Sequence, residues 1–290
     1  MHSRLSNSLL KLLSGMYSEV MSQATGWPRA PLLYVVAQLF IDQNHALTTQ
    51  LSALHLGLAK VGYTARREQE FQQVDFNLQT RELRETNGTL YEFAKPDLSH
   101  LIFIGKERID FATSQYSKFE VFLAEFQTAI QAVSQVLGET FLVRLDLRYI
   151  DWLEDQTDLP LEDQLIPNLH PPVLTTDLNN GQLINGHLIL QSEHDGVQLQ
   201  YQSMRGQAAR NHLAVFGTVR PPIKRLTPMP TQPDGIVLDF DCFKLFDALA
   251  PNRPDLMAAS TMLEHCHETA STLFKQCISS AASEYFQSKP

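Results

Sequence analysis

Apolar side chains recur every three or four residues in several stretches of the chain, which is typical of helices that bury one face. The clearest stretch is 118–137, and Gly138 follows it where a helix would end. Ser117 and Glu120 have the spacing of a capping box, in which two side chains accept hydrogen bonds from backbone amides at the helix start. We therefore expect a long helix over 118–137 that begins with this box. Its buried stripe comprises Phe119, Phe122, Leu123, Phe126, Ile130, Val133 and Leu137.

Three further stretches have the same helical period. Residues 3–24 carry a leucine-rich stripe that ends before Trp27. This helix either packs on its own domain or docks as an arm on another subunit or partner. A helix over 47–58 places leucines on one face and ends near Gly62. A long final helix is expected over 256–286.

Other stretches alternate apolar and polar residues, or remain apolar for several residues, and both patterns are typical of strands. The best of them is 141–152. Asn87 and Gly88 form a turn-like pair that we expect to join two strands. The remaining expected strands are 32–41, 70–80, 89–95, 101–105, 108–113, 188–191, 197–201, 213–219 and 236–240.

These elements predict an α+β fold, with an antiparallel or mixed sheet and long helices packed on it. In the first half the expected order is β-α-β-β-(β-β)-α-β, which resembles an elaborated ferredoxin-like arrangement. An acidic, proline-containing passage after residue 155 marks a boundary. We expect an amphipathic arm over 1–28, an α+β half over 29–155, and a second α+β half over 156–290 that packs closely on the first.

Charge is segregated along the second half of the chain. Between Tyr149 and Met204 there are nine acidic residues and no lysine or arginine, whereas the stretch from Arg205 to Pro233 has no acidic residue. Such segregation gives the surface an acidic region and a basic region. Each region favours a partner of opposite charge. The basic side chains meet a protein partner, meet the phosphates of a nucleic acid, or offset the acidic passage of the same molecule. They are Arg205, Arg210, Arg220, Lys224 and Arg225.

Composition narrows the class of protein. Hydrophobic residues make up 43% of the chain and charged residues 19%, as in ordinary globular proteins. The net charge of −9 argues against general nucleic-acid binding. The three cysteines form no C-x-x-C pair, which is typical of reduced cysteines in the cytosol. No apolar run approaches the roughly 20 residues of a membrane span, so we expect a cytoplasmic protein without membrane contact.

Two groups of charged residues lie on predicted strands. Strand alternation places Arg144, Asp146 and Arg148 on one face. There they either bind an anion or the acidic chain of a partner, or form an ion network within the sheet. Asp239 and Asp241 also share a face, and such carboxylates either hold a divalent metal or cap a following turn. In proteins the second alternative is the more common for each group, namely an ion network within the sheet and a capped turn.

The chain carries no recognisable catalytic motif. It has no G-x-S-x-G, no P-loop and no G-x-G-x-x-G. His265 and His267 point to nearly opposite sides of the predicted final helix, so they cannot chelate one metal ion together. The sequence therefore favours a protein without enzymatic activity and without a cofactor. The candidate binding residues are Arg144, Asp146, Arg148, Arg205, Arg210, Arg220, Lys224 and Arg225.

Three segments carry a resemblance, namely Ala30-Pro31-Leu32, Arg144-Leu145-Asp146-Leu147-Arg148-Tyr149-Ile150-Asp151 and Leu238-Asp239-Phe240-Asp241. In this order they resemble a sporadically distributed bacterial family of proteins of about this length. The chain departs from the family pattern at Arg29, Asp146 and Asp151, where Asn, Gly and Asn are usual. The resemblance implies that residues 29–280 share the fold of this family. It implies no chemical activity. The family's sporadic distribution implies a mobile or defence-type gene neighbourhood.

From these observations we expect a non-enzymatic, cytoplasmic binding protein that acts through its charged faces and its N-terminal arm. It would be an accessory subunit or regulator in a bacterial multi-gene system, with a protein partner or a second copy of itself. The alternative is a nucleic-acid-interacting protein or metal-dependent nuclease. In that case the basic stretch would meet phosphates, and Asp239 and Asp241 would hold the metal.

Overall fold

Antiparallel pairing of β-strands organises the molecule. The computed structural model describes residues 27–77, 82–167, 183–191, 197–205, 209, 213, 235–247, 249–250 and 252–288, and over 71–87 and 183–205 it describes the backbone alone. Within these residues one sheet has nine strands in the order β2-β3-β4-β5-β1-β6-β9-β8-β7. Every neighbouring pair is antiparallel. The strands are β1 (Leu32–Ile41), β2 (Ala65–Asn77), β3 (Glu82–Ala94), β4 (His100–Ile104), β5 (Arg108–Thr113), β6 (Leu142–Leu153), β7 (Leu183–Gln191), β8 (Val197–Arg205) and β9 (Ile236–Leu245).

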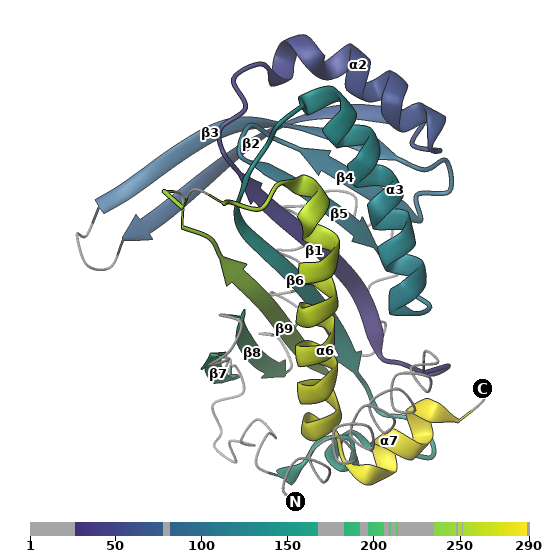
Figure 1. Ribbon diagram of the computed structural model, residues 1–290. Helices are drawn as coiled ribbons and strands as arrows, with labels where there is room; N and C mark the ends of the chain where they lie inside the picture. The colour runs from purple at the N-terminus through teal and green to yellow at the C-terminus, as the bar shows by residue number, and fades with distance from the viewer. Residues whose placement is uncertain are drawn as a thin grey trace, which may run out of the picture.

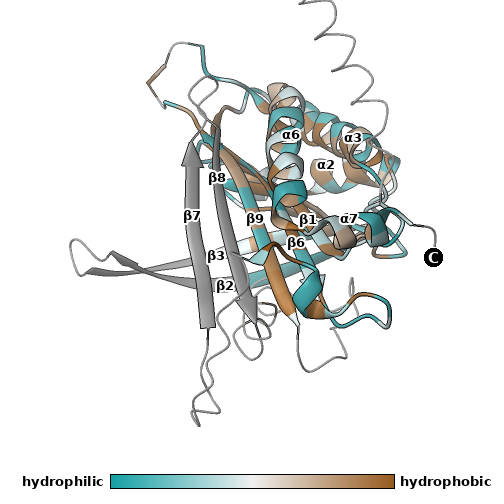
Figure 2. Ribbon diagram, turned by 90° about the horizontal axis from the view of Figure 1, so that it is seen from below, coloured by the Kyte–Doolittle hydropathy of each residue, from teal (hydrophilic) through white to brown (hydrophobic). Residues whose placement is uncertain are grey.

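Three helices cover one face of this sheet, as Figures 1 and 2 show for α2, α3 and α6. α6 packs on β6 and β9, and α2 packs on α3. The helices bury their apolar stripes against the alternate, apolar residues of the strands, which form the main core with them. The predicted α+β class, an antiparallel sheet with helices packed on it, is confirmed. The helices are α2 (Leu47–Lys60), α3 (Phe119–Leu137), α6 (Ala259–Cys277) and α7 (Ser280–Gln287), with short 3₁₀ turns at Leu161–Asp163 and Leu256–Ala258.

Two details of the predicted helices are wrong. Lys118 precedes the first turn of α3, and no side chain caps that end, because the helix begins one residue later than a box at Ser117 requires. The final helix divides at Ile278, whose extended backbone ends α6. Ser279 then begins α7, because its hydroxyl accepts a hydrogen bond from the amide of Ala282 at 3.0 Å.

The turn predicted at Asn87 and Gly88 is also wrong. Both residues lie inside β3, where they pair with Gln72 and Phe71 of β2, because the ladder between the two strands continues for several residues beyond them. In β3 the residues from Tyr91 to Ala94 pair with β4. The outer parts of β2 and β3 therefore project as a long hairpin, which Figure 1 shows.

Some predictions fall on residues that the structure does not describe. The amphipathic helix over 3–24 is one of them. The strand over 213–219 is another, apart from Leu213, which is helical rather than extended. In the part of the chain that is described, none of the helices combines the length and apolar composition that a membrane span requires.

The two predicted halves share the sheet. β6 belongs to the first half and pairs from Arg144 to Leu153 with β9 of the second half. β5 and β6 run in the same direction on either side of β1, and α3 connects them. The order β1-α2-β2-β3-β4-β5-α3-β6 is the one expected from the sequence.

A second apolar cluster lies on the sheet face opposite the main core, and it includes Ile150, Trp152 and Val237. Gly235 packs directly against the indole ring of Trp152. A Cβ atom added at Gly235 would lie 2.2 Å from that ring, far inside van der Waals contact. Close packing therefore requires a glycine at this position.

We expect Gly235→Ala to lower the free energy of unfolding by about 1–3 kcal/mol, because the new methyl group overpacks the cluster around Trp152. Urea denaturation followed by circular dichroism measures this loss. Gly57→Ala is the matched control. Its methyl group would meet Ala132 and Val136 at 3.6 Å, and alanine favours the α2 helix by about 1 kcal/mol. Equal effects of the two variants would contradict the packing at Gly235.

Candidate functional site

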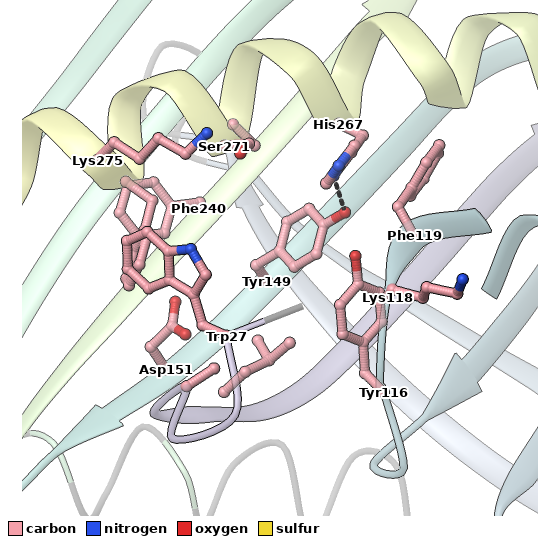
Figure 3. Close-up of a pocket in the computed structure, with 14 residues that line it drawn as sticks. Trp27, Tyr116, Lys118, Phe119, Tyr149, Asp151, Phe240, His267, Ser271 and Lys275 are labelled. Atoms are coloured by element: carbon pink, nitrogen blue, oxygen red, sulfur yellow. Dashed lines mark hydrogen bonds between the residues drawn. The ribbon is translucent and has the colours of Figure 1, made fainter. Parts of the chain in front are cut away.

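A pocket opens on the helical side of the sheet, between α6, β6, β9 and the segment that leads into β1 (Figure 3). Its volume is about 150 Å³. Most of its lining is apolar or aromatic, with a few polar groups, as in small-molecule sites of proteins. The lining residues are Trp27, Ala30, Leu32, Tyr116, Lys118, Phe119, Tyr149, Asp151, Phe240, His267, Ala270, Ser271, Phe274 and Lys275.

Aromatic rings from separate elements form the pocket walls. Trp27 lies 5.5 Å from Phe274 of α6, measured between ring centroids. Tyr116 meets Tyr149 edge to face at 6.0 Å. These contacts fix the rings in place, because each is a tilted or edge arrangement that aromatic pairs prefer. The walls are therefore built before any ligand arrives.

A tyrosine and a histidine share a hydrogen bond at one end of the pocket. The Tyr149 hydroxyl lies 2.8 Å from Nδ1 of His267. The imidazole also stacks on Phe119 at a centroid distance of 4.0 Å. Burial, assisted by the charge of Lys275, lowers the pKa of His267 to about 4, whereas burial raises the pKa of Tyr149. At neutral pH both groups are uncharged.

Asp151 is the unusual member of the lining. The helix-facing residues of β6 are Leu145, Leu147, Tyr149, Asp151 and Leu153, so a carboxyl group occupies a position in an apolar series. Asp151 is 4% exposed, and none of the described residues forms a hydrogen bond with its side chain. Figure 3 shows the carboxyl group directed toward Trp27.

The environment of Asp151 favours its protonated form. Burial raises the pKa of its carboxyl group to about 8, and the charge of Asp239 adds to the increase. At neutral pH the group is therefore mostly a carboxylic acid, which has one O–H donor and a free acceptor. Buried polar groups normally have hydrogen-bond partners. The donor and the acceptor of the Asp151 carboxyl group are therefore available to a bound molecule.

Two lysines lie at the edge of the pocket, and both are exposed. Lys275 extends along α6 toward Ser271 in Figure 3, whereas the ammonium group of Lys118 points away from Tyr116. Among the described residues neither lysine has an ion-pair partner. Lys275 therefore supplies the positive charge that faces the pocket.

The charged residues predicted on the 141–152 strand share a face, which is the face opposite the pocket. There the Arg144 Nε atom lies 2.5 Å from Asp146 Oδ1, and its guanidinium group also lies 3.7 Å from Asp241. Arg148 donates two hydrogen bonds to Asp239, at 2.7 and 2.5 Å. Both arginines thus belong to an ion network within the sheet, the structural alternative for these residues, and the geometry gives no support to anion binding.

The ion network also accounts for the two aspartates of β9. Asp239 is 2% exposed, and its carboxylate accepts two hydrogen bonds from the Arg148 guanidinium. In the described part of the chain no group of three or more His, Cys, Asp or Glu side chains is arranged to hold a metal ion. The metal-site hypothesis for Asp239 and Asp241 therefore has no third ligand within these residues.

The basic stretch cannot be placed in the same way. Arg205 ends β8, where its backbone pairs with Ile236 of β9 and Leu183 of β7. The other members, Arg210, Arg220, Lys224 and Arg225, lie outside the described residues. Their role with protein, phosphate or the acidic passage stays a prediction.

Sequence reasoning missed the pocket. It treated His267 as half of a rejected metal pair and Asp151 as a departure from a family pattern. One signal was available, because a carboxylate interrupts the apolar series of β6. The aromatic walls gave no such signal, since they come from segments far apart in the sequence.

Comparison with known proteins does not assign the chain to a family. No family model, no curated protein and no solved structure is detectably similar to the chain. The function must therefore be inferred from the geometry of the site.

Arg148→Met should lower the free energy of unfolding by about 3–5 kcal/mol, because Asp239 would stay buried without its guanidinium. The double variant Arg148→Met with Asp239→Leu should lose less than the single variant, because it removes the buried charge as well. Urea denaturation of both proteins tests this order. If the double variant is the less stable of the two, the ion pair does not act as described.

A second prediction concerns Asp151. Its pKa is raised from about 3.9 in unfolded chains to about 8 in the folded protein, so the wild-type protein loses stability as the pH rises between these values. Asp151→Asn removes the ionisation. The melting temperature of the variant, relative to wild type, should therefore increase from pH 4 to pH 8 and then level off.

The control for this measurement is Asp158→Asn, which removes an exposed carboxylate on the loop after β6. We expect no comparable increase with pH in that variant. A difference between Asp151→Asn and wild type that stays constant from pH 4 to pH 9 would contradict a protonated Asp151.

Proposed function

We propose that the protein is a binding protein, and that its ligand is a small organic molecule held in the pocket between α6 and β6. The observation that carries this proposal is the Asp151 carboxyl group, which is buried, faces the pocket, and has no hydrogen-bond partner among the described residues. Asp151 lines the pocket, and its protonated carboxyl group offers a ligand one hydrogen-bond donor and an acceptor.

The pocket walls support the same conclusion. A space of about 150 Å³ remains open between these packed rings. Trp27 also contacts Phe286 of α7, with ring centroids 6.3 Å apart. The walls are thus held by the core on several sides, and a ligand would enter a preformed site.

The pair of Tyr149 and His267 favours binding over chemistry. A general base works best when its pKa lies near the working pH, but the pKa of His267 is lowered to about 4. The pKa of Tyr149 is raised by burial, which disfavours the tyrosinate that would act as a nucleophile. The hydrogen-bonded pair of Tyr149 and His267 is therefore suited to orienting a ligand.

The architecture also bears on the first half of the chain. We propose that residues 29–155 form an elaborated ferredoxin-like unit. The support is that β5 and β6 are parallel on either side of β1 and are joined by α3, while β4 pairs on the other side of β5. The hairpin of β2 and β3 would be the elaboration.

The wider setting remains a proposal that rests on the sequence. An accessory or regulatory role in a bacterial multi-gene system follows from the resemblance, and a protein partner or self-association follows from the segregated charge. A small ligand in the pocket is compatible with such a role, because a regulator responds to a signal that it binds.

The test is a screen of single-ring organic compounds by thermal denaturation, using the wild-type protein and Ala30→Trp. Ala30 is exposed at the mouth of the pocket, so an indole there blocks the entrance without disturbing the core. A ligand at 100 times its Kd stabilises the folded state by about 2.7 kcal/mol. We expect compounds that raise the melting temperature of the wild type and have no effect on Ala30→Trp.

Ala281→Trp is the matched control, because Ala281 is exposed on α7 and does not line the pocket. It should respond to the compounds as the wild type does. The proposal fails if no compound stabilises the wild type, or if every compound that does so stabilises Ala30→Trp equally.

A further inference from the structure

The dimensions of the pocket limit the ligand to about one ring. Its volume is about 150 Å³, and an engineered protein cavity of about this volume binds benzene. The walls include Trp27, Phe240 and Phe274, and the last two meet edge to face at 5.9 Å. Such walls favour a flat aromatic ring, since aromatic pairs gain about 0.5–1.5 kcal/mol beyond the burial of their surface.

The two ends of the pocket differ in chemistry. In Figure 3, Asp151 lies on one side of the Trp27 ring, and Lys275 and Ser271 lie on the other. The protonated carboxyl group of Asp151 can donate one hydrogen bond and accept another, which matches a hydroxyl group. Lys275 and Ser271 offer an ammonium group and a hydroxyl group, which match a carboxylate.

On this basis, and resting on the proposed function, we propose that the ligand is a hydroxylated monocyclic aromatic carboxylate. Its ring packs on Trp27 and Phe274, and its hydroxyl group exchanges hydrogen bonds with Asp151. Its carboxylate meets Lys275 and Ser271 at the mouth of the pocket.

The charges around the pocket agree with an anionic ligand. Asp151 is mostly protonated at neutral pH because its pKa is raised to about 8, and His267 is neutral. Asp239, whose charge raises the pKa of Asp151, forms an ion pair with Arg148 on the other face. The two basic residues of the lining, Lys118 and Lys275, therefore favour an acid over an amine of the same size.

The experiment measures Kd by isothermal titration calorimetry at pH 7, with para-hydroxybenzoate as the reference probe. Benzoate lacks the hydroxyl group and should bind about five-fold more weakly, since a neutral hydrogen bond contributes about 1 kcal/mol. Para-hydroxybenzamide lacks the charge and should bind about ten-fold more weakly, since a hydrogen bond to a charged group contributes about 1.5–3 kcal/mol. Cyclohexanecarboxylate keeps the acid and loses the aromatic ring, and it should also bind more weakly than benzoate.

Two lysine variants separate the local contact from the general effect of charge. Lys275→Met should weaken para-hydroxybenzoate about ten-fold and leave para-hydroxybenzamide unchanged. Lys118→Met makes the same change of charge at the same pocket, but its ammonium group points away from Tyr116, so it should weaken para-hydroxybenzoate less than two-fold. Both lysines are exposed, so the variants are expected to fold.

The outcomes distinguish this inference from the proposed function. If other compounds bind and Ala30→Trp blocks them, while the aromatic acids do not bind, the ligand class is wrong and the proposed function stands. If Lys275→Met and Lys118→Met have equal effects, the carboxylate is not held as described. If no compound of any class binds the pocket, both proposals fall.

Discussion

The antiparallel pairing of β6 with β1 on one side and β9 on the other is the constraint on which the rest of this structure depends. β6 lies inside the sheet, between β1 and β9. One of its faces packs in the main core and the other carries the ion network, so the two faces cannot be interchanged. A shift of one residue along either neighbour would turn its apolar series toward the ion network and its charged residues toward the helices. The main core, the ion network and the pocket are all placed by this one register.

The two faces of β6 fix that register in different ways. On the helical face, Leu145 and Leu147 are fully buried, which provides the favourable free energy of apolar burial. On the opposite face, Arg148 and Asp239 form a bidentate pair. A buried ion pair adds little net stability because both charges lose their hydration. Its effect here is to make other pairings of β6 and β9 unfavourable, since they would bury charges without partners.

The pocket depends on the point where the apolar series of β6 is interrupted. Asp151 is tolerated there because the surrounding burial keeps it protonated, and because open space lies beside it instead of packed side chains. His267 is kept neutral by the same burial from the facing helix. A region that is apolar in its walls and uncharged in its polar groups can therefore take up an organic ring. Lys275, which lines the edge of the pocket, comes from the exposed side of α6.

The sequence by itself determined the class of the fold and most of the elements that the structure describes. The bounds of β1, the leucine face of α2 and the buried stripe of α3 followed from periodicity, because a helix or strand buries residues at its own fixed spacing. Element ends were predicted less well. The capping box at Ser117, the turn at Asn87 and Gly88, and the unbroken final helix were wrong. Such ends depend on where a ladder stops or where a distant segment pairs, as Leu165 pairs with Ile278 at the end of α6.

The tertiary structure alone decided the partners of each charged group and the existence of the pocket. Alternation placed Arg144, Asp146 and Arg148 on one face, but the pairing of Arg148 with Asp239 was decided by the neighbouring strand β9. Trp27, Tyr116 and Phe274 are separated by long stretches of chain, and they meet because the sheet and α6 bring their segments together. Local patterns report which way a side chain points. The space left between distant side chains is a property of the packed molecule, and no local pattern contains it.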